Sequence, residues 1–190
     1  MHELIEKRRS PRAYSTRPVE PEKLRELFEA ARWAASCFNE QPWRFIYAAR
    51  EDKENFNRLF DCLVEKNQLW VKNAPLLMLT VACGTFAHNG KPNRHAWHDV
   101  GLAMGNFTLQ ASALGLYVHQ MAGFSSDKAR ENLGLPAGYD PVAMVTVGYL
   151  GDIGQLPESL RQAETAPRSR KALDELVHYG AWGTKSGLPA

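Results

Sequence analysis

The stretch from Asp99 to Leu114 limits the possible folds of this chain more than any other segment. It is apolar nearly all the way round a helix, and Gly101 and Gly105 stand one turn apart within it. A helix without a polar face has to be buried, and glycine lets a neighbouring backbone come close. Gly115 then occupies a position that suits the end of the helix. The sequence therefore predicts a long internal helix with other elements packed around it.

Amphipathic helices and apolar strands alternate through the rest of the chain. Apolar residues at helical spacing predict one helix over residues 21–36, with Pro21 in its first turn, and another over residues 56–69. The continuous apolar run Pro75–Ala82 is typical of a strand that is covered on both faces. The other predicted elements are strands at residues 44–49, 116–121 and 142–150, a short helix between Ser125 or Ser126 and Gly134, and a terminal turn or helix at Lys171–Val177.

These elements predict one domain of a layered α/β or α+β type. The 190 residues, 44% of them hydrophobic and 23% charged, can bury a full core. The connections are too uneven for a regular Rossmann fold, and the sequence contains neither a GxGxxG nor a GxxxxGK[ST] motif. Gly84–His98 is predicted to be a long polar loop, which is a common place for functional residues, and residues 151–165 are linker-like.

Cysteine usage and hydropathy indicate where the protein works. Its three cysteines lack CxxC spacing, so they indicate neither a disulfide framework nor a structural zinc site, and they suit a reducing cytosol. The sequence shows no apolar leader and no apolar run long enough to span a bilayer. We therefore expect a soluble, cytoplasmic protein without a membrane partner.

Basic side chains gather at two places that are far apart in the sequence. Residues 7–12 and 168–171 hold seven of the 23 basic residues and no acidic residue, which leaves 16 basic against 21 acidic side chains elsewhere. Arginine binds phosphate oxygens through a planar pair of N–H groups, and a neighbouring serine adds a short donor. Two interpretations stay open: two halves of one phosphate site, or two separate solvated basic runs. The acidic remainder argues against nucleic acid as the partner and favours a small anionic ligand.

A second polar motif follows the first predicted helix. Ser36, Asn39 and Gln41 offer polar groups there, while Pro42 and Trp43 fix the chain and add an aromatic wall. On its own, such a stretch often does no more than end a helix. Together with the first basic run, it points to a specific family.

The chain closely resembles the FMN-dependent nitroreductase family over nearly its whole length. The motifs that carry the resemblance, in the family's order, are Arg8-Arg9-Ser10-Pro11-Arg12, Ser36/Asn39-x-Gln41-Pro42-Trp43, His98-Asp99-Val100-Gly101, Gly115-Leu116 through Met121-Ala122-Gly123-Phe124, Val147-Gly148-Tyr149 and Arg168-Ser169-Arg170-Lys171. The resemblance implies an α+β fold with a central mixed β-sheet flanked by helices. It also implies an interlocked homodimer that binds two FMN molecules at the subunit interface.

The resemblance assigns the two basic runs to the cofactor. The implied phosphate ligands are Arg8, Ser10, Arg168 and Arg170, with Arg9 in the same cluster. Arg12 would lie near the ribityl chain and the N1/O2 edge of the flavin, where a cation stabilises the reduced, anionic ring. Asn67 would lie near the ribityl and pyrimidine end.

The remaining implied site residues surround the reactive side of the flavin. One subunit would lend Ala35, Ser36 and Cys37, with Asn39 beside them, to the flavin of the other. Met121, Ala122 and Gly123 would lie at flavin N5 and O4, which the backbone N–H groups of Ala122 and Gly123 face. Ala122 departs from relatives that carry an acidic residue there. That change alters the polarity near N5, and with it the expected substrate preference, but it leaves backbone donation intact.

The implied activity is oxidoreduction by alternating half-reactions. NAD(P)H would deliver hydride to flavin N5 and leave, and a nitroaromatic, quinone or other unsaturated acceptor would then be reduced at the same face, which predicts ping-pong kinetics. No protein nucleophile is required. The choice between NADH and NADPH stays open, and so do two alternatives. These are a dehalogenase or dehydrogenase on the same scaffold, and a non-catalytic flavin-binding or sensory module.

Histidines outside these motifs have more than one interpretation. His88, His95 and His98 lie close together in the sequence and could suggest a metal site. Three histidines in a polar loop are more often exposed to solvent, so we expect no metal. His119, between apolar neighbours, is interpreted as a core histidine or a wall of the cofactor pocket.

Two features are candidates for the substrate side of the site. Trp70 could contact substrate or flavin, although core packing is the simpler role for a tryptophan. The loop at residues 84–98 is a candidate lid over the substrate, and residues 151–190 form a C-terminal extension of the same domain.

Overall fold

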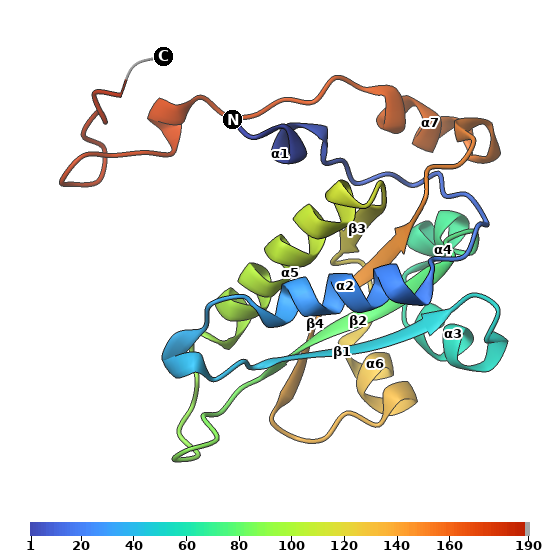
Figure 1. Cartoon of the computed structure of the whole chain (residues 1–190), viewed down its shortest axis with the longest axis horizontal. Coiled ribbons are helices and arrows are strands. Elements are labelled where there is room, and N and C mark those ends of the chain that lie inside the picture. Colours follow the sequence, from blue (N-terminus) through green and yellow to red (C-terminus); the bar gives the residue numbers. More distant parts are fainter. Residues whose placement is uncertain (189–190) are drawn as a thin grey trace.

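Four antiparallel strands form the central sheet of the computed structural model, which describes residues 1–188 (Figure 1). Their order along the sheet is β1 (Trp43–Ala49), β2 (Leu76–Cys83), β4 (Tyr139–Gly148) and β3 (Tyr117–Met121). Each neighbouring pair is antiparallel, so the prediction of a mixed sheet is wrong. A long helix carries the chain from β2 to β3, which run in the same direction, but β4 lies between them and pairs with both. The helical crossover therefore joins β2 and β3, two parallel strands that are not neighbours in the sheet.

Helices connect the strands and cover the sheet. Their bounds are α1 (Glu3–Lys7), α2 (Pro21–Arg32), α3 (Lys53–Phe60), α4 (Glu65–Val71), α5 (Ala96–Ala113), α6 (Ser126–Leu133) and α7 (Glu158–Thr165). Short 3₁₀ turns lie at η1 (Cys37–Asn39), η2 (Ile153–Gln155) and η3 (Leu173–Glu175).

Local sequence signals set several helix ends where they were predicted. Pro21 begins α2, although this helix ends at Arg32, earlier than the predicted residue 36. The Ser125 side chain accepts the Lys128 N–H at 3.2 Å at the start of α6, and Gly134 ends that helix with a φ of 63°. Both positions agree with the predicted caps because a cap depends on its immediate neighbours in the chain.

Residues 151–165 are not the linker that the sequence predicted. They contain η2 and the α7 helix, whose Leu160 is buried, as is Leu156 just before it. Both leucines join the apolar layer beneath α3 and α4. This tertiary contact stabilises a helix that is short and mostly polar.

Two apolar layers lie on the two faces of the sheet. One layer contains α2 and α5, and the other contains α3, α4 and α6 (Figure 1). Leu77 and Leu79 of β2 belong to one layer, whereas Met78, between them in the sequence, belongs to the other. The prediction of a strand covered on both faces is confirmed, because β2 occupies a central place in the sheet.

The long helix α5 is buried on one face only. Phe107 is fully buried against the sheet, whereas Leu102 and Leu109 on the outward face are 41% and 36% exposed. A Cβ added at Gly101 or Gly105 would meet no atom within 4 Å. The prediction of a helix buried all round is therefore wrong for the outward face, because a single chain offers only one sheet to cover it.

The helix predicted over residues 56–69 is two helices with a break between them. Residues 62–64 leave the helix and pair with residues 123–125 after β3. The Val64 N–H donates to the Gly123 carbonyl at 3.1 Å, and the Ser125 N–H donates to the Cys62 carbonyl at 2.8 Å. These long-range hydrogen bonds replace helical ones and break the helix. The apolar residues keep helical spacing on both sides of the break, so the sequence pattern does not reveal the break. Of the helices in residues 1–188, none combines the length and apolar character that crossing a bilayer requires.

Candidate functional site

The two basic runs, which stand near opposite ends of the sequence, lie side by side in the structure. The N-terminal segment between α1 and α2 runs close to α7 and the segment that follows it (Figure 1). Arg168 donates from Nη1 to the Arg8 carbonyl and from Nη2 to the Glu6 carbonyl, both at 2.8 Å. Burial, followed by the charges of Arg170 and Arg168, lowers the pKa of Arg8. The two basic runs are therefore neighbours in the fold, as one shared anion site would require.

A cavity of about 200 Å³ lies between these runs. The residues that line it are Arg8, Arg9, Ser10, Pro11, Arg12, Ala163, Glu164, Ala166 and Arg168. Arg9 is largely exposed and donates from Nη2 to the Glu164 carbonyl at 3.0 Å. Arg170 is also exposed and donates to the Ser169 carbonyl at 2.6 Å, outside the lining. The structure therefore places Arg8, Ser10 and Arg168 around the cavity and Arg170 at its periphery.

A larger cavity of about 520 Å³ adjoins β3. The residues that line it are Arg12, Val64, Lys66, Asn67, Trp70, His119, Gln120, Met121, Ala122, Gly123, Ser159, Leu160 and Ala163. Arg12 and Ala163 line both cavities, so the two adjoin at these residues. The structure thus brings Arg12, Asn67 and residues 121–123 together from the N-terminal run, α4 and the turn after β3.

The break between α3 and α4 builds one wall of the larger cavity. Because residues 62–64 pair with residues 123–125, α4 starts directly over the turn after β3. Asn67 donates from Nδ2 to the Gly123 carbonyl at 3.0 Å. A Cβ at position 123 would stand only 2.6 Å from that nitrogen, so any larger residue there would displace the Asn67 amide.

The peptide that joins Pro11 to Arg12 is held on both sides by side chains. His119 of β3 has Nδ1 2.9 Å from the Pro11 carbonyl oxygen. Glu164 of α7 accepts the Arg12 backbone N–H at Oε1, at 3.0 Å, and its Oε2 lies 3.6 Å from Arg12 Nη1. The extended run is thereby fixed between the sheet and α7, at the junction of the two cavities.

His119 is a wall of the cavity and is uncharged near neutral pH. Burial lowers its pKa, and the positive charge of Arg12 lowers it further. The centroid of its ring lies 4.8 Å from that of the Trp70 ring, and Trp70 is itself buried and stacks on Tyr14. The predicted role of His119 as a pocket wall agrees with this placement, and Trp70 combines core packing with a place in the cavity lining.

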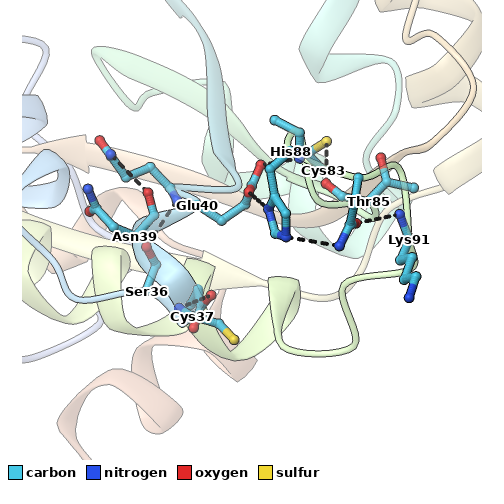
Figure 2. Close-up of polar contacts among 12 residues, drawn as sticks. Ser36, Cys37, Asn39, Glu40, Cys83, Thr85, His88 and Lys91 are labelled. Carbon is cyan, nitrogen blue, oxygen red and sulfur yellow. Dashed lines mark hydrogen bonds and ion pairs between the residues drawn. The ribbon is translucent and has the colours of Figure 1, made fainter.

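Residues 35–41 lie beside the start of α5 (Figure 1), and none of them lines either cavity. The Cys37 N–H donates to Asp99 Oδ2 at 3.0 Å, and the Gln41 N–H donates to Ser36 Oγ at 3.0 Å (Figure 2). Ala35 and Asn39 are exposed. The single chain therefore does not bring Ala35, Ser36, Cys37 and Asn39 to the other predicted site residues.

The loop after β2 is attached to the same turn. Glu40 Oε1 accepts the Ala87 N–H at 2.8 Å, and its Oε2 lies 3.9 Å from His88 Nδ1 (Figure 2). His98 instead lies beside Asp99, so the loop histidines have different neighbours. Within residues 1–188, no three His, Cys, Asp or Glu side chains are grouped in a way that could hold a metal ion.

Glu164 is a site residue that sequence reasoning missed. Its helix was interpreted as a linker, so its carboxylate was not considered beside the basic run. Leu156, Leu160 and Glu164 follow one another at helical spacing, with the two leucines buried and Glu164 at the cavity. That spacing is the signal that could have identified both the helix and the residue.

The fold and the two adjoining cavities define an α+β protein with an arginine-lined cleft beside the outer strand of its sheet. A profile of the Nitroreductase family matches residues 5–149, and the chain belongs to that family. Among solved structures, one described as the oxidoreductase containing FMN is 36% identical, with a TM-score of 0.91 over 97% of this chain and 94% of that chain.

Two further relatives show the range of similarity. An FMN-dependent nitroreductase from Clostridium difficile R20291 is 25% identical, with a TM-score of 0.71 over 94% of this chain and 98% of that chain. A NADH dehydrogenase of Thermus thermophilus is 29% identical, and the match covers 78% of this chain and 85% of that protein.

Proposed function

We propose that this chain is an FMN-dependent oxidoreductase that uses NAD(P)H to reduce nitroaromatic, quinone or other unsaturated acceptors. Membership of the Nitroreductase family and similarity to FMN-containing oxidoreductases support this assignment. The observation that carries it is the junction of a cationic cavity and a larger, aromatic-walled cavity at Arg12. When bound, FMN supplies hydride transfer at N5, and the protein binds, orients and tunes it.

The smaller cavity suits the phosphate of FMN. Arg8, Ser10 and Arg168 line it, and a phosphate carries close to two negative charges that need several partners when water is removed. Arg8 is already partly desolvated and lies near two further cations. An anion entering here relieves the repulsion between these cations, so the charge of the site matches the ligand.

The larger cavity suits the ring and ribityl chain. Arg12 would face the N1/O2 edge, where a cation favours electron uptake by the ring. Asn67 would stand near the ribityl and pyrimidine end while it holds the turn at Gly123. Met121 and Ala122 complete that turn, so backbone N–H groups rather than a charged side chain would face N5 and O4.

The second subunit of a homodimer would complete the site. Ala35–Asn39 lie away from the cavities of their own chain and carry Phe38, which is 81% exposed. The outward face of α5 is apolar, and its glycines leave room for another backbone. In the C-terminal extension, Tyr179 and Trp182 are also exposed. Two copies that join along α5 would cover these surfaces and bring residues 35–39 to the flavin of the other copy.

The decisive experiment is a titration of the purified chain with FMN, followed by rapid mixing with NADH and with NADPH. We expect one flavin per chain, fast bleaching of its visible absorbance, and reoxidation by nitro, quinone or enone acceptors with ping-pong kinetics. Protein that takes up no FMN would contradict the proposal. Protein that binds FMN but is reduced by neither nucleotide would instead be a flavin-binding module, and turnover restricted to halogenated substrates would identify a dehalogenase.

A further inference from the structure

Glu164 of α7 is a nearly buried carboxylate beside the N-terminal basic run. Its side chain is 10% exposed, and that of its partner Arg12 is 30% exposed. One carboxylate oxygen accepts the Arg12 backbone N–H at 3.0 Å, and the other lies 3.6 Å from Arg12 Nη1. A single acidic side chain therefore holds both the backbone and the guanidinium of Arg12.

The charge of Glu164 also acts on two neighbouring side chains, Tyr14 and His119. Burial raises the pKa of Tyr14, and the negative charge of Glu164 raises it further. Burial lowers the pKa of His119, and the charge of Glu164 opposes that shift. His119 lines the larger cavity, so the field of Glu164 reaches the space between α7 and β3.

The net charge that a ligand meets in the larger cavity depends on the side chains of Arg12 and Glu164. Arg12 lines the two cavities, whereas Glu164 lines the smaller one. A carboxylate this close to a guanidinium cancels part of the field of the guanidinium at longer range. Removing the carboxylate charge while keeping its hydrogen bond would therefore make the larger cavity more positive.

We propose that Glu164 is a positioning residue that lowers the reduction potential of the bound flavin by holding and partly neutralising Arg12. The inference rests on the proposed function, in which the FMN ring occupies the larger cavity. Reduction of the ring by two electrons, with uptake of one proton, adds one negative charge, and NAD(P)H supplies both electrons. Arg12 stabilises the added charge, and Glu164 opposes that stabilisation.

The test compares Glu164→Gln with Glu158→Gln in FMN-loaded protein. Glutamine has the size of glutamate and keeps one oxygen that accepts the Arg12 N–H, while the charge and the second acceptor, which faces Arg12 Nη1, are lost. Glu158 lies on the same helix, is 67% exposed and contacts Arg161 at 2.8 Å, which makes it a matched control. The two readouts are the midpoint potential, from reductive titration against a reference dye, and the Kd of oxidised FMN.

Glu164→Gln should bind reduced FMN about 3- to 10-fold more tightly relative to oxidised FMN than the unmodified chain does. For a two-electron couple, a tenfold change in this ratio corresponds to a rise of about 30 mV in midpoint potential. Glu158→Gln should leave the ratio unchanged. Arg12→Gln, which removes the cation that Glu164 offsets, should shift it in the opposite direction.

An unchanged or lower potential in folded, FMN-loaded Glu164→Gln protein would overturn the inference, as would an equal shift in Glu158→Gln. A purely structural role for Glu164 would weaken the binding of oxidised and reduced FMN alike and leave the potential where it was. Failure of the proposed function looks different, because the unmodified chain would then bind no FMN. That result would overturn both proposals.

Discussion

Asn67 and Gly123 are held in contact by a hydrogen bond of 3.0 Å from Asn67 Nδ2 to the Gly123 carbonyl oxygen. The contact ties α4 to the turn after β3 and leaves no space for a side chain at position 123. A Cβ there would stand 2.6 Å from Asn67 Nδ2 and 3.0 Å from Val64 Cγ2. One pair of residues thus sets both the shape of the larger cavity and the residue type that the turn accepts.

Gly123→Ala should lower the free energy of unfolding by about 1–3 kcal/mol, because the added methyl group forces Asn67 and Val64 to move. It should also weaken FMN binding, since the displaced turn lines the cavity. Chemical denaturation and an FMN titration measure the two effects. In an Asn67→Ala background the methyl group has room, so the same change should cost less. Equal losses in both backgrounds would show that the contact with Asn67 is not the cause.

Arg8→Ala should weaken FMN binding by about 1.5–3 kcal/mol, which is the scale of a charge-assisted hydrogen bond. Lys7→Ala is the matched control, because Lys7 belongs to the same basic run but is 70% exposed and bonds Glu3 at 2.7 Å. Fluorescence titration of FMN gives both values, and similar small changes in the two variants would argue against a phosphate site here. Arg170→Ala is a separate test of the role that family resemblance implies, since Arg170 lies outside the cavity lining.

Stability should fall in mildly acidic solution because of His119. Its pKa in the folded chain is lowered from 6.5, so the unfolded chain binds a proton more readily. The stability that the neutral ring contributes is therefore fully present above about pH 6.5 and is lost as the pH falls from there through the folded pKa. A tenfold difference in proton affinity between the folded and unfolded chains corresponds to about 1.4 kcal/mol of stability.

His119→Asn is the variant that isolates this effect, because asparagine keeps an N–H donor near the Pro11 carbonyl but does not titrate. Arg12 and Glu164, the charged groups that act on the ring in opposite directions, remain in place. The measurement is the thermal unfolding midpoint of both proteins between pH 5 and pH 7.5. We expect the unmodified chain to lose more stability than the variant over this range. Parallel profiles would exclude His119 as the source.

Leu109→Glu should convert the proposed dimer into monomers, because it places a charge on the apolar outward face of α5. Leu109 is 36% exposed in the single chain, and Ile153 on η2 is 39% exposed, so Ile153→Glu is a control of similar exposure. Light scattering coupled to gel filtration reports the mass of each protein. Loss of bound FMN together with the dimer would support a site completed by residues 35–39 of the second subunit. A Leu109→Glu protein that stays dimeric would place the interface elsewhere.

Local chemistry made much of the fold predictable from the sequence. Pro21, Ser125 and Gly134 act on their own neighbours in the chain, so the ends that they set agree with the structure. The apolar run of β2 and the apolar composition of α5 identified the elements that contribute to the core, although α5 is buried on one face only. The basic residues near both ends pointed to an anion, because arginine clusters carry their charge whatever the fold.

Contacts between residues distant in the sequence determined the features of the fold and the site that the sequence did not predict. The break at residues 61–64 comes from hydrogen bonds to residues 123–125, which no local pattern records. The antiparallel sheet follows from the insertion of β4 between two strands joined by a helix. Glu164 entered the site because buried leucines stabilise a helix that looked like a linker. The sequence by itself determined the four strands and several helix ends, and it predicted an anionic ligand, since those depend on nearby residues and residue type. Tertiary structure decided which residues meet, because only packing brings groups from opposite ends of the chain within hydrogen-bond distance.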